Sequence, residues 1–215
     1  HGRVLGRLTM DDLGEVVAEE LEEHIGHMAG TGEEDAVSTK TFAALRQRLP
    51  WLLISLTGGI GTAYLLGFFE GELIEHPLLM FFVPLIAGMG GSVGVQTSSI
   101  MVRGLATGDI LSEDLFLRFR REFSLALMAS VVCAILSCIF ISLVLEQRET
   151  GLLVAIALII TMVVAAMLGT LIPLALKSIN IEPALSTGPF LTIGNDILGI
   201  TIYMLLVKHL PALLF

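Results

Sequence analysis

Long apolar runs alternate with short polar segments along most of the chain. Five of these runs could cross the roughly 30 Å hydrocarbon core of a bilayer as helices, at residues 50–69, 77–102, 123–145, 152–176 and 183–207. The first 48 residues are different, because they hold many charges and only short amphipathic stretches. The pattern predicts an all-α membrane protein with five transmembrane helices behind a polar N-terminal arm.

The composition fits this class and excludes others. The chain is 54% hydrophobic and 15% charged, with a mean hydropathy of +0.86, and a soluble domain could not bury that much apolar surface. The net charge is −9, and acidic residues are dense in the arm. That argues against a nucleic-acid partner and is compatible with cation binding. We therefore expect membrane lipids around the chain and no nucleic acid.

Basic residues flank the apolar runs unevenly. They precede the first run, fill the segment between the second and third, and follow the fourth: Lys40, Arg46, Arg48, Arg103, Arg118, Arg120, Arg121 and Lys177. The segment between the first two runs is acidic. Under the positive-inside rule this distribution predicts a cytoplasmic N-terminus. Lys208 and His209, after the last run, argue mildly against it.

The arm contains two helical patterns. In the first, Thr9 or Asp11 could cap a helix that continues toward Met28. In the second, Phe42, Leu45 and Leu49 share one face just before the first span. This second segment is either an interfacial anchor or a connecting helix that carries a cytosolic signal to the membrane.

One acidic residue, Asp196, lies deep inside the last apolar run. A carboxylate at membrane depth is costly, so such residues usually face a polar cavity and mark a path for ions or protons. Asp196 is therefore the best candidate for a functional residue.

Gly and Pro residues interrupt the second and fifth runs. They are Pro84, Gly88, Gly90, Gly91 and Gly94 in one, and Pro183, Gly188, Pro189, Gly194 and Gly199 in the other. Paired interrupted spans are typical of a central ion site, where freed carbonyls serve as ligands. The alternative is that the glycines only allow helices to pack closely.

Polar side chains accompany these interruptions. Ser92, Gln96 and Ser99 share a helical face with Arg103, and Thr192 lies one turn before Asp196. Oxygen ligands without thiolate or imidazole suit Mg²⁺ or a similar hard cation. The residues predicted to hold the ion are Asp196, Asn195, Thr192, Gly188, Ser92 and Gln96.

A single carboxylate cannot replace the inner water shell of a small divalent cation, because Mg²⁺ gives up its waters reluctantly. A twofold dimer would bring two Asp196 side chains to one axis, each touching a hydrated ion through water. We therefore expect a homodimer with a pore on the axis, lined by the second and fifth spans.

Two long motifs resemble a known family. Residues 84–96 and 102–110 closely resemble the second membrane helix of MgtE-type magnesium channels, and residues 182–189 and 195–199 resemble their fifth helix. Residues 48–51 are similar to the start of the family's first helix. Residues 8–12 are similar to the end of the CBS domain that precedes it. Ser92 departs from the family's usual Asn, and Glu182 from its usual Asp.

The resemblance implies a homodimer with five helices per subunit that conducts Mg²⁺ into the cell across the bacterial inner membrane. Asp196 matches the family's pore acid. Residues 1–30 would be a remnant of the cytosolic CBS region, 31–49 the connecting (plug) helix, and 50–215 the transmembrane pore domain.

Two other functions could also involve an intramembrane carboxylate. A proton- or Na⁺-coupled divalent cation carrier could also use Asp196. An intramembrane aspartyl protease would need two carboxylates that share a site, and no second span carries one. We therefore expect a Mg²⁺ channel or transporter and not an enzyme.

Overall fold

Helices form nearly all of the described part of the chain in this computed structural model. The structure describes residues 9–12, 14, 16, 41–107, 115–181 and 183–209. It does not describe the side chains of residues 43, 47 and 183–186. The elements are α3 (Thr41–Gly67), α4 (Glu70–Glu75), the 3₁₀ helix η1 (Pro77–Phe82), α5 (Val83–Ala106), α6 (Leu115–Val144), α7 (Arg148–Ser178) and α8 (Pro183–His209). Within these ranges, five helices are long and apolar enough to cross a membrane. The predicted all-α membrane fold is confirmed.

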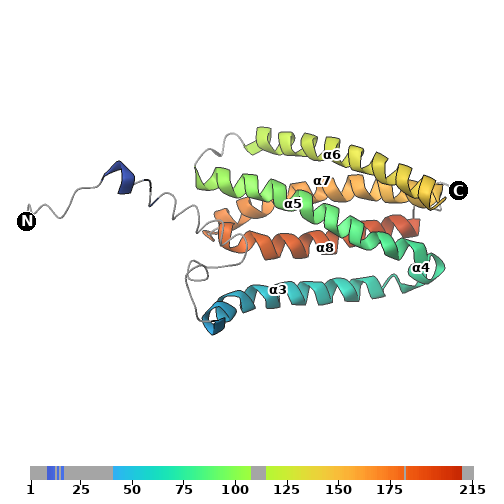
Figure 1. Ribbon diagram of the computed structural model, residues 1–215, viewed down its shortest axis with the longest axis horizontal. Helices are drawn as coiled ribbons and strands as arrows, with labels where there is room; N and C mark the ends of the chain where they lie inside the picture. The colour runs from blue at the N-terminus through green and yellow to red at the C-terminus, as the bar shows by residue number, and fades with distance from the viewer. Residues whose placement is uncertain are drawn as a thin grey trace, which may run out of the picture.

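Helix α7 lies at the centre of the bundle (Figure 1). It packs against α5, α6 and α8, and 56% of its most apolar stretch is buried. Helix α3 lies at the edge and packs mainly on α8, so only 11% of its corresponding stretch is buried. Most of the α3 surface is therefore open to lipid or to another protein.

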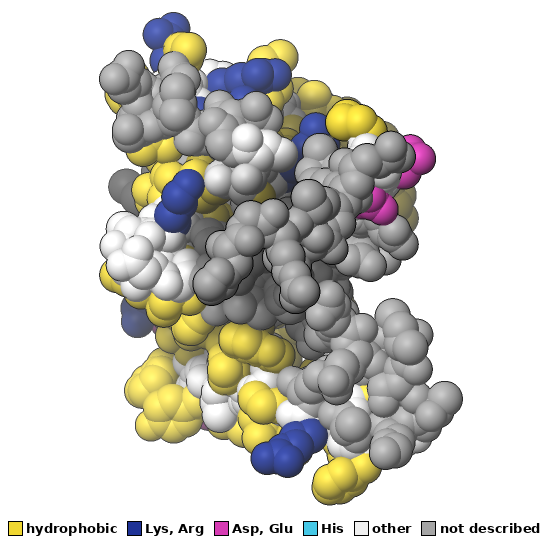
Figure 2. All heavy atoms as spheres, turned by 90° about the vertical axis from the view of Figure 1, so that its left-hand side faces the viewer, with side chains coloured by type: hydrophobic (Ala, Val, Ile, Leu, Met, Phe, Trp, Pro, Cys, Tyr) yellow, Lys and Arg dark blue, Asp and Glu magenta, His cyan; other side chains and the backbone are white. Residues whose placement is uncertain are grey.

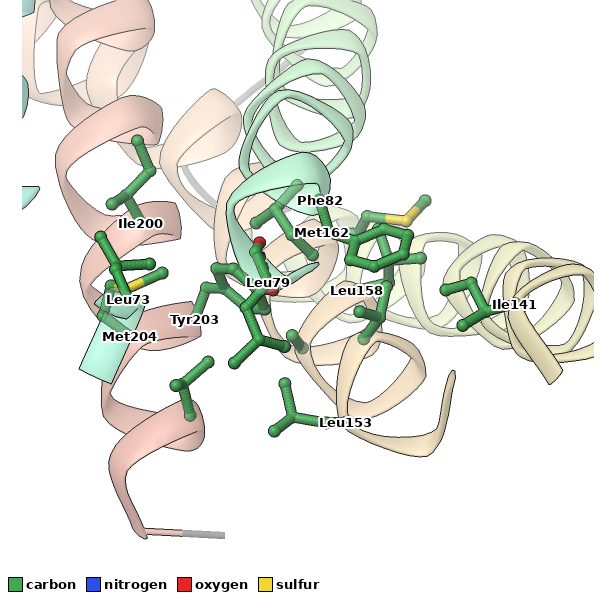
Figure 3. Close-up of a cluster of buried hydrophobic side chains, with 14 residues drawn as sticks. Leu73, Leu79, Phe82, Ile141, Leu153, Leu158, Met162, Ile200, Tyr203 and Met204 are labelled. Carbon is green, nitrogen blue, oxygen red and sulfur yellow. Dashed lines mark hydrogen bonds between the residues drawn. The ribbon is translucent and has the colours of Figure 1, made fainter. Parts of the chain in front are cut away.

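A cluster of buried apolar side chains lies where α4 and η1 cover the ends of α7 and α8 (Figure 3). Phe82, Leu158 and Met162 pack there together with Tyr203. The Tyr203 hydroxyl donates a hydrogen bond of 2.9 Å to the Leu79 carbonyl. This bond joins η1 to α8, and it gives the buried phenol the partner that it needs.

The acidic connection between the first two spans is folded, not extended. It forms α4 and η1, and Glu72 on α4 lies 3.2 Å from Lys208 at the end of α8. Hydrogen bonds from its own backbone N–H and from Lys208 lower the pKa of Glu72 below its ordinary 4.5. The pair also explains why a basic residue stands at this end of the bundle, since Glu72 balances the charge of Lys208.

Two spanning helices begin earlier than the hydropathy indicated. Helix α3 starts at Thr41 and passes through Pro50 without ending, so the described part of the connecting segment continues directly into the first span. Helix α6 starts at Leu115, eight residues before the expected start at Phe123. Charged residues at the membrane edge therefore belong to the helices themselves.

The capping prediction in the arm is confirmed for Thr9. The Thr9 backbone N–H donates 2.7 Å to the Asp12 carboxylate, and the Asp12 backbone N–H donates 3.3 Å to the Thr9 hydroxyl. These two contacts form a reciprocal capping box. Residues 17–40 and Glu182, which also carried predictions, lie outside the described residues.

Candidate ion site

The two helices with candidate ligands are continuous. Pro84 lies in the first turn of α5, where a missing N–H costs no helical hydrogen bond. Pro189 lies inside α8, which nevertheless runs on to His209. The expected interruption is wrong for α8, which continues through Pro189, whereas the second span changes from the 3₁₀ helix η1 to α5 just before Pro84. Because Pro189 has no N–H, the carbonyl four residues before it, at Leu185, lacks its usual helical hydrogen bond.

Helix α8 presents a polar face that the described part of the chain leaves at least partly open. Gly188, Thr192 and Asp196 are spaced by four residues along it, and none of the three is buried. The Thr192 hydroxyl donates 3.0 Å to the Gly188 carbonyl. The same carbonyl is also an i→i+4 acceptor within the α-helix, so both of its lone pairs are engaged and little capacity remains for an ion.

Helix α5 presents a similar open face beside it. Ser92 and Gln96 are exposed, and the Ser92 hydroxyl donates 2.8 Å to the Gly88 carbonyl. The two helices run in opposite directions and are in contact (Figure 1). The polar faces predicted from the sequence therefore lie on neighbouring helices and are both uncovered.

Asn195 occupies a different face of α8. It is only 4% exposed, and its Nδ2 donates 3.4 Å to the Gly90 carbonyl on α5. Its Oδ1 is buried without a hydrogen-bond partner in the described part of the chain. The structure thus separates two adjacent candidates, with Asp196 toward the open side and Asn195 toward α5.

Close packing explains some of the glycines. A Cβ at Gly94 would collide with Nδ2 of Asn195, and a Cβ at Gly169 of α7 would lie 2.6 Å from the Gly94 carbonyl oxygen. By contrast, a Cβ at Gly88 or Gly91 would meet nothing within 4 Å. Close helix packing therefore explains Gly94. It does not explain Gly88 and Gly91, where a side chain would have space.

Within the described ranges, no three His, Cys, Asp or Glu side chains come together as a possible metal site. One copy of the chain thus supplies Asp196 and uncharged oxygens, which cannot form the all-protein cage that a dehydrated Mg²⁺ would need. The chemistry of this face fits contact with a hydrated cation.

Glu122 is a buried acid, although it directly precedes the span predicted at residues 123–145. It is 6% exposed and lies on α6, four residues before the buried Ala126 and eight before the buried Ser130. Buried positions therefore recur every four residues along one face of α6, and Glu122 is the first of them. The small residues that follow at that spacing are the signal that could have identified it.

Basic side chains gather at one end of the bundle, which Figure 2 faces. They belong to the start of α6, to the ends of α5 and α7, and to the start of α3: Arg118, Arg120, Arg121, Arg103, Lys177, Arg46 and Arg48. Lys177 donates 3.4 Å to the Leu105 carbonyl and so joins the ends of α7 and α5. The fold thus brings together basic residues that are far apart in the sequence.

Comparisons with known proteins identify relatives of this chain. A family model described as "MgtE: Divalent cation transporter" matches residues 83–206, which span α5 to α8. Two relatives, each named magnesium transporter MgtE, are 32% identical over 93% of this chain in Bacillus subtilis (strain 168) and 30% identical over 93% in Enterococcus faecalis.

A third relative of the same name, from Thermus thermophilus, is 29% identical over 95% of this chain. The matches cover 44–46% of the three relatives, so this chain spans less than half of their length. The family model alone covers more than half of this chain. The chain therefore belongs to the MgtE family of divalent cation transporters.

Proposed function

We propose that this chain forms a Mg²⁺-selective channel or transporter, in which two copies enclose a pore that holds a hydrated Mg²⁺ near Asp196. The observation that carries this proposal is the open polar face of α5 and α8. Gln96 and Thr192 are exposed in the middle of their helices, and polar groups at that depth are costly against lipid. A water-filled pore is the environment that suits them.

A second copy supplies what one copy lacks. Two Asp196 carboxylates on a twofold axis would carry the charge that balances one divalent cation. The uncovered faces of α5 and α8, and the small buried fraction of α3, are surfaces that a partner could cover. Each carboxylate would contact the ion through its water shell.

The oxygen chemistry favours Mg²⁺. Thr192 and Ser92 offer hydroxyls, Gln96 offers an amide oxygen, and Asp196 offers a carboxylate. These are hard ligands, and Mg²⁺ usually retains several waters when it binds to proteins. The three relatives are named magnesium transporters, which supports the same ion for this chain.

The basic end of the bundle supports an orientation. Because cytoplasmic loops of membrane proteins carry an excess of Lys and Arg, we assign that end, and with it the N-terminus, to the cytoplasm. The relatives are bacterial, so the membrane would be the bacterial plasma membrane. Uptake would then bring Mg²⁺ from the end with α4 to the basic end.

The arm would act on the pore through α3. Residues 41–49 continue without a break into the span, and a Cβ at Gly58 would collide with Ile193 of α8. Ile193 lies three residues from Asp196. A movement of the connecting segment, residues 31–49, would therefore reach the ion site through one tight helix contact.

A liposome assay tests the proposal. Purified protein would be reconstituted, and Mg²⁺ influx would be measured with an internal indicator for the wild type, Asp196→Ala and Glu149→Ala. Glu149 is an exposed acid at the start of α7, so its replacement is the matched control. We expect Asp196→Ala to lose nearly all flux while folding and associating normally.

Wild-type flux from a well-folded Asp196→Ala protein would overturn the pore assignment. A coupled carrier is the alternative, because a lone intramembrane carboxylate can also bind a proton or Na⁺. Influx that depends on a proton or Na⁺ gradient and saturates at a low rate would favour the carrier.

A further inference from the structure

Asn195 ties the helix that carries Asp196 to a fixed point of the bundle. Its Nδ2 donates to the Gly90 carbonyl across 3.4 Å. Gly94, one turn further along α5, provides the space, since a Cβ there would collide with the amide. The contact therefore depends on a directional bond from α8 and on a glycine of α5.

The α5 backbone is held from its other side as well. Gly169 of α7 approaches so closely that a Cβ there would lie 2.6 Å from the Gly94 carbonyl and 3.1 Å from the Ser98 backbone nitrogen. Helix α7 is the most buried of the five spans. Asn195 thus anchors α8 to a backbone that the central helix already holds in place.

The amide is not there merely to fill space. Its Oδ1 is buried without a partner in the described part of the chain, and a buried polar atom without a hydrogen bond is unfavourable. An aliphatic side chain of similar volume would fill the same gap without that cost. What the amide adds is the direction of its bond to Gly90.

We propose that Asn195 is a positioning residue for ion selection, which fixes the rotation of α8 about its axis and so the direction of the Asp196 carboxylate. The proposal rests on the proposed function. Successive residues of an α-helix are about 100° apart around the axis. With Asn195 held against α5, Asp196 is turned toward the open face that carries Thr192.

This position matters for selection because the ion keeps its waters. A carboxylate that meets a hydrated cation must match the arrangement of its water shell, and that arrangement differs between Mg²⁺ and the larger Ca²⁺. A rotated α8 would still present a negative charge to the pore. The carboxylate would point in the wrong direction, so the protein would lose its discrimination between Mg²⁺ and Ca²⁺ while it still transported ions.

The decisive variant is Asn195→Leu, which keeps the volume and removes both amide atoms. We expect it to fold and associate like the wild type, because the bond and the unpartnered oxygen are removed together. In liposomes that report Mg²⁺ and Ca²⁺ influx, normalised to folded protein, its Mg²⁺-to-Ca²⁺ flux ratio should fall about fivefold, the effect of losing roughly one hydrogen bond. An unchanged ratio would overturn the proposal, since the shape is preserved.

A second variant keeps the test decisive if Asn195→Leu does not fold. In Gly94→Ala/Asn195→Ala the new methyl group fills the space of the missing amide but makes no hydrogen bond. If Asn195 positions α8, the double variant should have a normal folded yield but a reduced Mg²⁺-to-Ca²⁺ flux ratio. If Asn195 only fills space, the folded yield and the flux ratio should both equal those of the wild type. A wild-type protein without Asp196-dependent flux would instead refute the proposed function, independently of Asn195.

Discussion

Gly169 of α7 lies against the backbone of Gly94 on α5, so that a Cβ at position 169 would lie 2.6 Å from the Gly94 carbonyl oxygen. The atom in the way is backbone, which cannot rotate aside as a side chain can. This contact sets the distance between the central helix and the helix that carries Ser92 and Gln96.

Gly169→Ala should therefore destabilise the protein. The added methyl group would force α5 and α7 apart, at a cost of about 1–3 kcal/mol, as is typical of overpacking. The thermal midpoint of the detergent-solubilised protein would measure this. Gly199→Ala is the matched control, because a Cβ there meets nothing within 4 Å. Equal midpoints for the two variants would contradict the close contact.

Tyr203→Phe tests the link between η1 and α8. The change removes only the hydroxyl that donates 2.9 Å to the Leu79 carbonyl, so the free energy of unfolding should fall by about 1 kcal/mol. Mg²⁺ flux should be unchanged, because Tyr203 packs in the apolar cluster and not on the open face. Tyr64→Phe, at a tyrosine that is 72% exposed on α3, should leave the stability unaltered.

Glu72 predicts a pH dependence at the end of α8. Its pKa is lowered in the folded protein, so its contribution to stability is present above the unfolded pKa near 4.5 and is lost as the pH falls through the folded value. Glu72→Gln should slightly lower the thermal midpoint at pH 7. The difference from the wild type should disappear well below pH 4.5. Glu75→Gln on the same helix is the control, and a difference that persists at low pH would contradict the Glu72–Lys208 pair.

Ion choice gives a prediction that concerns the whole site. Mn²⁺ and Co²⁺ share the size and octahedral preference of Mg²⁺, so the proposed water-mediated site should pass them. Ca²⁺ takes more ligands at longer distances, and its flux should be at least about tenfold lower. Influx measured with each ion in turn would check this. Equal permeability to Ca²⁺ and Mg²⁺ would show that the site does not select as argued.

Hydropathy predicted the spans because membrane helices must be long and apolar, and that property is local. The same signal missed the start of α6, since Arg118, Arg120 and Arg121 lower the average although the helix continues through them. It also could not show that residues 70–82 fold into α4 and η1, because their partners Tyr203 and Lys208 lie far along the chain.

The candidate site was predictable as a set of residues but not as a geometry. The sequence identified Asp196 from its isolation among apolar residues. It could not show that Asn195, the next residue, faces α5, because the orientation of a helix follows from its neighbours. Pro189 gave a wrong expectation of a broken helix, since α8 continues through it, whereas η1 does give way to α5 just before Pro84.

The pairing of α3 with α8 has a consequence for how the protein is made. Among the five described spans, α3 is synthesised first and finds its main partner in α8, which is synthesised last, with residues 68–182 between them. Contacts so distant in sequence form late and slowly. Throughout synthesis α3 must therefore hold its place in the bilayer by its own hydropathy, which at 1.5 is the lowest of the five spans.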